Sequence, residues 1–126
     1  MLVVFYLAWL IAIVLVGVGI YALAAPQQLA RQYGVVAHGH DAAGWVRATG
    51  IRDVALGVAL GATAYLHAVV LLVVLAAIGV VVSIADFSIV SHHGGHGRLH
   101  AGHAIHASGV VAFILIIAMA LFAIGK

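Results

Sequence analysis

The sequence predicts an all-α protein that is embedded in a membrane as a four-helix bundle. Hydrophobic residues make up 67% of the 126 residues and charged residues only 6%, whereas soluble domains contain about 25% charged residues. The apolar residues also fall into four stretches, each close to the ~20 residues that span a bilayer. We therefore expect a single transmembrane domain over residues 1–126, with helices over residues 2–24, 45–66, 68–90 and 100–124.

The first predicted helix, residues 2–24, ends just before Pro26, the only proline of the chain, because proline lacks the N–H that continues a helix. The stretch is longer than the core of a signal peptide, about 7–15 residues, and no Lys or Arg precedes it, so we expect an uncleaved spanning helix. The polar loop that follows has room for a short interfacial helix, with Tyr33 and Trp45 as headgroup-level anchors.

The second predicted helix, residues 45–66, begins with charged residues and continues with small ones. Its first turns carry Arg47, Arg52 and Asp53. Further along, Gly57 and Gly61 form a GxxxG pattern, in which missing side chains let a neighbouring helix approach closely. This pattern favours packing inside the bundle, and a homodimer through the Gly57/Gly61 face is the alternative.

The third and fourth predicted helices, residues 68–90 and 100–124, flank a histidine-rich segment. The third is rich in valine but too long and continuous to be a strand. Helical spacing places a set of small and polar residues on one face of it, leading toward the segment: Gly79, Ser83, Asp86, Val90 and His93. The two halves of the chain share the order helix, loop with histidine and glycine, helix, which indicates a weak two-hairpin pseudo-repeat.

The basic residues predict how the helices are oriented in the membrane. The two loops on one side, with the adjoining helix ends, carry Arg31, Arg47, Arg52 and Arg98, whereas the other side carries Lys126. Because basic residues favour the cytoplasmic side, we expect a multi-pass protein of a bacterial-type inner membrane, with a cytoplasmic histidine-rich loop and both termini outside (N-out/C-out). The formal charge is only +2 and no basic patch is interleaved with aromatics, so the expected partner is the lipid bilayer and not a nucleic acid.

Six of the nine histidines lie between Ser91 and His106. Spacing of i, i+4 and i+7 puts His96, His100 and His103 on one helical face. Since the chain has no cysteine, a metal site here would use nitrogen and oxygen ligands of the kind that suit Zn²⁺, Cu²⁺ or Ni²⁺. The predicted ligand set is His93, His96, His100, His103 and Asp86. The alternatives are a flexible tract that binds metal loosely and a proton-linked ligand, because histidine titrates near neutral pH.

Asp86 is a carboxylate within a predicted spanning helix, which costs roughly 2.5–3.5 kcal/mol and therefore calls for a partner. Arg47 and Arg52 are at the same membrane end. One interpretation is an Asp–Arg pair that only fixes two helices against each other. The other is a functional group: Asp86 with His93 or His103 as an acid–base pair. In a ligand site, Arg47, Arg52 and Asp53 would be the binding residues, with Arg47 placed to clamp an anionic group.

Several of these pieces together resemble a known family. They are the run around Gly50-Ile51-Arg52-Asp53, then Ala85-Asp86, His92-His93-Gly94 and His103-Ala104. Over roughly residues 45–120 the chain is similar to small four-helix membrane proteins grouped as domain of unknown function 4267. The resemblance implies a four-helix bundle with one polar cluster made of Gly50, Arg52, Asp53, Asp86, His93 and His103. It implies no activity, and His96, His100 and His106 go beyond the pattern.

Three functions follow from these observations. The leading hypothesis is a small membrane binding protein whose Asp/His cluster at the cytoplasmic end holds a divalent transition metal or a proton-linked ligand. The first alternative is a membrane enzyme that uses Asp86 and a histidine on a lipophilic substrate, for instance in an isomerisation or cyclisation. The second is a structural or accessory subunit. The sequence leaves open whether the protein is an enzyme.

Overall fold

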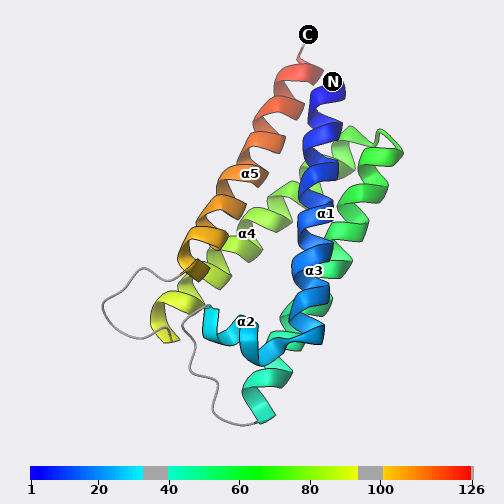
Figure 1. The fold of residues 1–126 in the computed structure, drawn as a ribbon. Coiled ribbons are helices and arrows are strands. Elements are labelled where there is room, and N and C mark those ends of the chain that lie inside the picture. The colour runs from blue at the N-terminus through cyan, green and yellow to red at the C-terminus, as the bar shows by residue number, and fades with distance from the viewer. Residues whose placement is uncertain (33–39, 94–100, 126) are drawn as a thin grey trace.

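The computed structural model describes residues 1–32, 40–93 and 101–125, and all regular structure within these ranges is helical. The prediction of an all-α protein is therefore confirmed. Figure 1 shows the helices in chain order: α1 (Leu2–Ala24), α2 (Pro26–Gln32), α3 (His40–Tyr65), α4 (Val69–His93) and α5 (Ala101–Ile124).

The helix bounds differ from the predicted ones mainly at the end of the molecule that carries α2. Pro26 ends α1 as predicted but also begins α2, the short helix for which the loop had room, because the first residue of a helix needs no N–H partner. α3 starts at His40, well before Trp45, since polar residues that dilute an apolar run do not break a helix. For the same reason α4 continues to His93. Tyr33, one of the two predicted anchors, lies outside the described residues.

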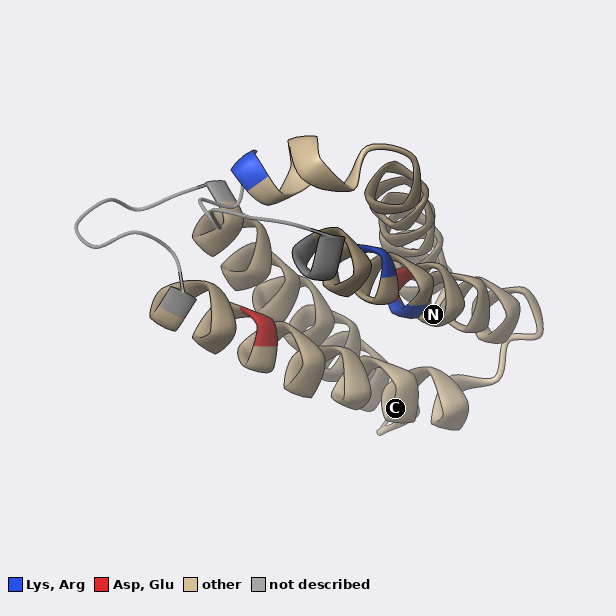
Figure 2. Cartoon of the chain, turned by 90° about the horizontal axis from the view of Figure 1, so that it is seen from below, with Lys and Arg blue, Asp and Glu red and all other residues tan. Residues whose placement is uncertain are grey.

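Three helices in the described part of the chain are long and apolar enough to cross a membrane: Leu2–Ala24, Val69–His92 and Gly102–Ile124. Their outward faces are apolar too, and in Figure 2 few segments of the ribbon carry a charge. These features indicate a membrane protein. α3 is as long as the others, but Arg52 and Asp53 interrupt its apolar character. The crossing of α3, and with it the bundle of four spanning helices and the N-out/C-out orientation, remains a prediction.

α1 and α3 run antiparallel and pack closely along one side of the molecule (Figure 1). Small residues make this approach possible: a Cβ atom added to Gly19 would lie 2.6 Å from the carbonyl oxygen of Gly50, and one added to Gly57 would lie 2.9 Å from that of Ala12. Gly57 of the GxxxG pattern therefore packs against α1 of the same chain. This contact needs no second copy of the protein.

α4 and α5 form the second antiparallel pair, through two facing stripes with alternating spacings of four and three residues. In α4 the stripe is Leu72, Ala76, Gly79, Ser83, Asp86 and Val90, and in α5 it is Gly102, His106, Gly109, Phe113, Ile116 and Ala120. A Cβ atom added to Gly79 would meet the Phe113 ring at 2.5 Å, and one added to Gly109 would meet the Ser83 hydroxyl at 2.9 Å. In the next layer, Asp86 faces His106. This spacing is that of helices packed with knobs into holes.

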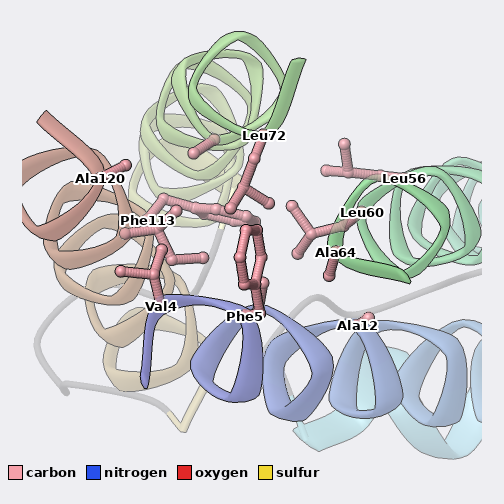
Figure 3. Close-up of a cluster of buried hydrophobic side chains, with 12 residues drawn as sticks. Val4, Phe5, Ala12, Leu56, Leu60, Ala64, Leu72, Phe113 and Ala120 are labelled. Carbon is pink, nitrogen blue, oxygen red and sulfur yellow. The ribbon is translucent and has the colours of Figure 1, made fainter. Parts of the chain in front are cut away.

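The two pairs are joined by a buried apolar cluster at the end of the molecule where both termini lie (Figures 1 and 3). All four long helices contribute to it, with Val4, Phe5, Leu60, Leu72, Phe113 and Ile116 among its members. Beyond this cluster, toward α2, a cavity lies between the pairs. The polar residues lie in that second region.

Candidate functional site

Arg52 of α3 binds Asp86 of α4 across the two helix pairs. The guanidinium donates two hydrogen bonds, from Nη1 to Oδ1 at 3.1 Å and from Nη2 to Oδ2 at 2.6 Å. The Asp86 side chain is only 8% exposed. A two-point arrangement of this kind is among the stronger interactions that a carboxylate makes. The contact identifies Arg52, and not Arg47, as the arginine that compensates the intramembrane carboxylate.

The same guanidinium also contacts a second carboxylate. Nη2 of Arg52 donates to Oδ1 of Asp53 at 3.2 Å. His106 of α5 approaches from the other side, with its Nδ1 atom 3.9 Å from Oδ2 of Asp86. That separation is too long for a hydrogen bond but close enough for electrostatic attraction when the imidazole is protonated. We call Arg52, Asp53, Asp86 and His106 the polar cluster.

The polar cluster borders a cavity of about 330 Å³ between the two helix pairs. Most of its wall is apolar and comes from α1 and α5, while its polar groups include Asp53, Asp86 and His106. Three wall residues are also well exposed on the outside, Leu10 to 59%, Val14 to 54% and Ile105 to 42%. The cavity therefore opens laterally between α1 and α5, on an exposed apolar face of the helices.

A second, much smaller space touches the polar cluster from the side of α2. Its volume is about 20 Å³, and Leu29, Trp45 and Thr49 line it together with Asp53, Asp86 and His106. A space of this size holds about one water molecule when polar partners are present. The carboxylates thus lie between a large apolar cavity and a water-sized pocket.

The remaining predicted site residues do not join this arrangement or lie outside what is described. Arg47 is exposed. His103 packs edge-on against the ring of Phe87, with ring centroids 5.3 Å apart. His96, His100 and the side chain of His93 are outside the described residues. In the described parts of the chain no three His or Asp side chains come together as a metal site would need, so the five-ligand metal site remains a prediction.

His106 is the member of the polar cluster that sequence reasoning did not select. The histidines were grouped by their spacing from one another, which favours His96, His100 and His103. The useful signal was the spacing of His106 from Gly109 and Phe113, residues that face α4. A histidine in register with the residues that pack on α4 is a better candidate partner for Asp86 than a histidine in register with other histidines.

Fold and cluster together define a small helical membrane protein with an ion-paired polar cluster beside an apolar cavity. Within this class the chain belongs to the family described as Domain of unknown function (DUF4267), whose sequence model matches residues 12–121. The family resemblance seen in the sequence is thereby confirmed, and the match extends over most of α1 as well. Neither a curated protein nor a solved structure matches the chain.

Proposed function

We propose that this protein binds a small lipophilic molecule with a polar head group inside the membrane. The observation that carries the proposal is the cavity of about 330 Å³ whose apolar wall ends at the buried carboxylate of Asp86. Pockets that hold small molecules span about 300–1,000 Å³ and combine apolar walls with a few polar groups. An ion pair that served only to fix two helices would not require a cavity beside it.

The lateral opening between α1 and α5 supports access from the bilayer. A lipophilic molecule that is dissolved among the acyl chains meets Leu10, Val14 and Ile105 first and reaches the polar cluster without crossing water. For this to occur, α3 must lie in the membrane as the fourth span of the bundle. Its Arg52 pairs with both Asp53 and Asp86, which lowers the cost of placing these side chains there.

The basic residues support an orientation with the polar cluster near the cytoplasmic face of a bacterial-type inner membrane. Arg31, Arg47 and Arg52 are all on α2 or in the first half of α3, which is the end opposite the two termini (Figure 1). The positive-inside rule then places both termini outside.

A membrane enzyme is the second candidate function. Asp86 and His106 face each other at the polar end of the cavity, 3.9 Å apart, and such a pair can move a proton to and from a bound molecule with a small shift of either side chain. Asp86 already accepts two hydrogen bonds from Arg52, so orienting a ligand requires less rearrangement than proton transfer. Binding is therefore the leading proposal.

Photolabelling in lipid nanodiscs tests the binding proposal. The probe is dodecanol carrying a diazirine in its chain, and mass spectrometry locates the labelled residues. Ala112 lines the cavity on α5, and Ala118 on the same helix is exposed, so Ala112→Phe fills the cavity while Ala118→Phe is the matched control. Ala112→Leu is a milder second variant.

We expect labels at the cavity wall to decrease about tenfold in Ala112→Phe and to persist in Ala118→Phe. Equal labelling of cavity-lining and lipid-facing residues, unchanged by both substitutions, would overturn the proposal. Far-UV circular dichroism and thermal unfolding in the same nanodiscs show that each variant has folded.

A further inference from the structure

The polar cluster carries an unbalanced charge. It contains one guanidinium, Arg52, and two carboxylates, Asp53 and Asp86. With His106 neutral, one positive and two negative formal charges give a net charge of −1. All three side chains besides Arg52 line the large cavity, whereas Arg52 is not part of its wall. The surface that a ligand meets is therefore the negative side of the cluster.

Asp53 is the less compensated of the two carboxylates. Asp86 receives two hydrogen bonds from Arg52, the shorter at 2.6 Å, while Asp53 shares one of the same nitrogens at 3.2 Å through Oδ1 alone. The Asp53 side chain is 16% exposed, and it lines both the large cavity and the water-sized pocket. Its uncovered surface thus faces the spaces in which a ligand or a water molecule would lie.

Resting on the function proposed above, we propose that the cavity selects lipophilic amines, with the ammonium head held at Asp53 and Asp86 and the alkyl tail along α1 and α5. A charge withdrawn from water and left without a counter-charge is costly. An ammonium group restores neutrality to the cluster and offers up to three N–H donors to carboxylate oxygens. A carboxylate head would add a third negative charge in a region of low dielectric constant and is repelled.

Three probes that differ only in their head groups test this selectivity: dodecylamine, dodecanol and dodecanoate, each with the same diazirine in the chain. Labelling is measured at about pH 8, where an ordinary imidazole is neutral. The readout is the ratio of label on cavity-lining residues to label on lipid-facing residues of the same protein. This ratio removes differences in how the probes partition into the bilayer.

We expect the ratio to be about tenfold higher for the amine than for the carboxylate, with the alcohol between them. Asp53→Asn should lower the labelling ratio of the amine to that of the alcohol. Asp41→Asn, which removes the same charge at the chain's remaining acidic residue, should leave the preference unchanged. If the Asp53→Asn protein does not fold, Asp53→Glu, which keeps the charge, must retain the order of the three probes.

The outcomes separate this inference from the function on which it rests. Equal cavity labelling by all three probes, abolished by Ala112→Phe, would leave lipophilic binding in place and overturn the amine selectivity. Preference for the amine that survives Asp53→Asn would overturn the assignment of the head group to Asp53. Absence of cavity-specific label with every probe would overturn both proposals.

Discussion

Removing Arg52 should destabilise this protein more than removing Asp86, although the two side chains form one ion pair. Arg52→Met removes the counter-charge that Arg52 supplies to two carboxylates, Asp53 and Asp86. Asp86→Asn leaves Arg52 still paired with Asp53. The asymmetry follows from one guanidinium serving two carboxylates, and a simple pair of equals would not show it.

Burial and geometry give the expected loss of stability for each variant. Loss of one partner of a buried ion pair costs about 3–5 kcal/mol. Because the side chain of Arg52 is 37% exposed while that of Asp86 is 8% exposed, we expect a reduced cost of about 2–4 kcal/mol for Arg52→Met. For Asp86→Asn the lost charge-assisted hydrogen bonds correspond to about 1–2 kcal/mol. Arg52→Lys should lie between wild type and Arg52→Met, since an ammonium cannot reproduce the two-point contact.

Unfolding by sodium dodecyl sulfate in mixed micelles, followed by far-UV circular dichroism, measures these differences. The double variant Arg52→Met/Asp86→Asn completes a cycle, and we expect a coupling free energy of about 1–3 kcal/mol between the two positions. Two results would refute this reasoning. One is that the stability losses of the two single variants add up to that of the double variant within about 0.5 kcal/mol. The other is that Asp86→Asn loses as much stability as Arg52→Met. Additivity would show that the guanidinium does not bridge the helix pairs, and equal costs would show that it does not serve both carboxylates.

Three further predictions concern other parts of the molecule. Gly79→Ala should lower stability by about 1–3 kcal/mol and reduce the melting temperature, because the added Cβ atom would lie 2.5 Å from the Phe113 ring; an unchanged melting temperature would contradict the α4–α5 register. His67 has a φ of 52° in the α3–α4 turn, so His67→Val should be about 1–2 kcal/mol less stable than His67→Gly, and the reverse order in thermal unfolding would reject this turn. The metal hypothesis predicts about one zinc, copper or nickel ion per chain in protein purified without a histidine tag, and loss of this ion in the double variant His100→Ala/His103→Ala. Mass spectrometry measures the metal content. Substoichiometric metal that is equal in both proteins would reject the hypothesis.

The sequence was informative wherever one local signal determines the structure. The apolar run of α1 and the proline after it predicted the bounds Leu2–Ala24, and the helical face with Gly79, Ser83 and Asp86 is the face of α4 that packs on α5. The start of α3 at His40 was not predictable from hydrophobicity, because a helix can continue through polar residues with no change of backbone geometry.

The choice between Arg47 and Arg52 depends on packing that no local pattern records. At about 100° per residue, Arg52 lies on the same face of α3 as Leu56, which joins the apolar cluster that the helix pairs share. Arg47 lies about 140° from Arg52 around the helix axis, on the other side of α3. The rotation of α3 is set by the close approach of Gly50 and Gly57 to α1. Only when that contact is known can the arginine that reaches Asp86 be identified.

The cavity was likewise beyond sequence reasoning, since it arises from how two helix pairs meet. Large side chains such as Phe5 and Phe113 fill the space between the pairs near the termini. At the level of Asp86 the facing positions are occupied by smaller or polar groups, among them Ser83 and Gly109. The space depends on residues distant in the chain, and none of them signals a cavity by itself.

Native mass spectrometry of the protein released directly from its membrane tests lipophilic binding most directly. We predict a bound molecule, at most one per chain, that is retained by Ala118→Phe and lost from Ala112→Phe, because only Ala112→Phe fills the cavity between α1 and α5. Fragmentation of the released molecule then shows its head group. Wild-type protein that carries no bound molecule, or one held equally by both variants, would contradict the assignment of the cavity as a binding site.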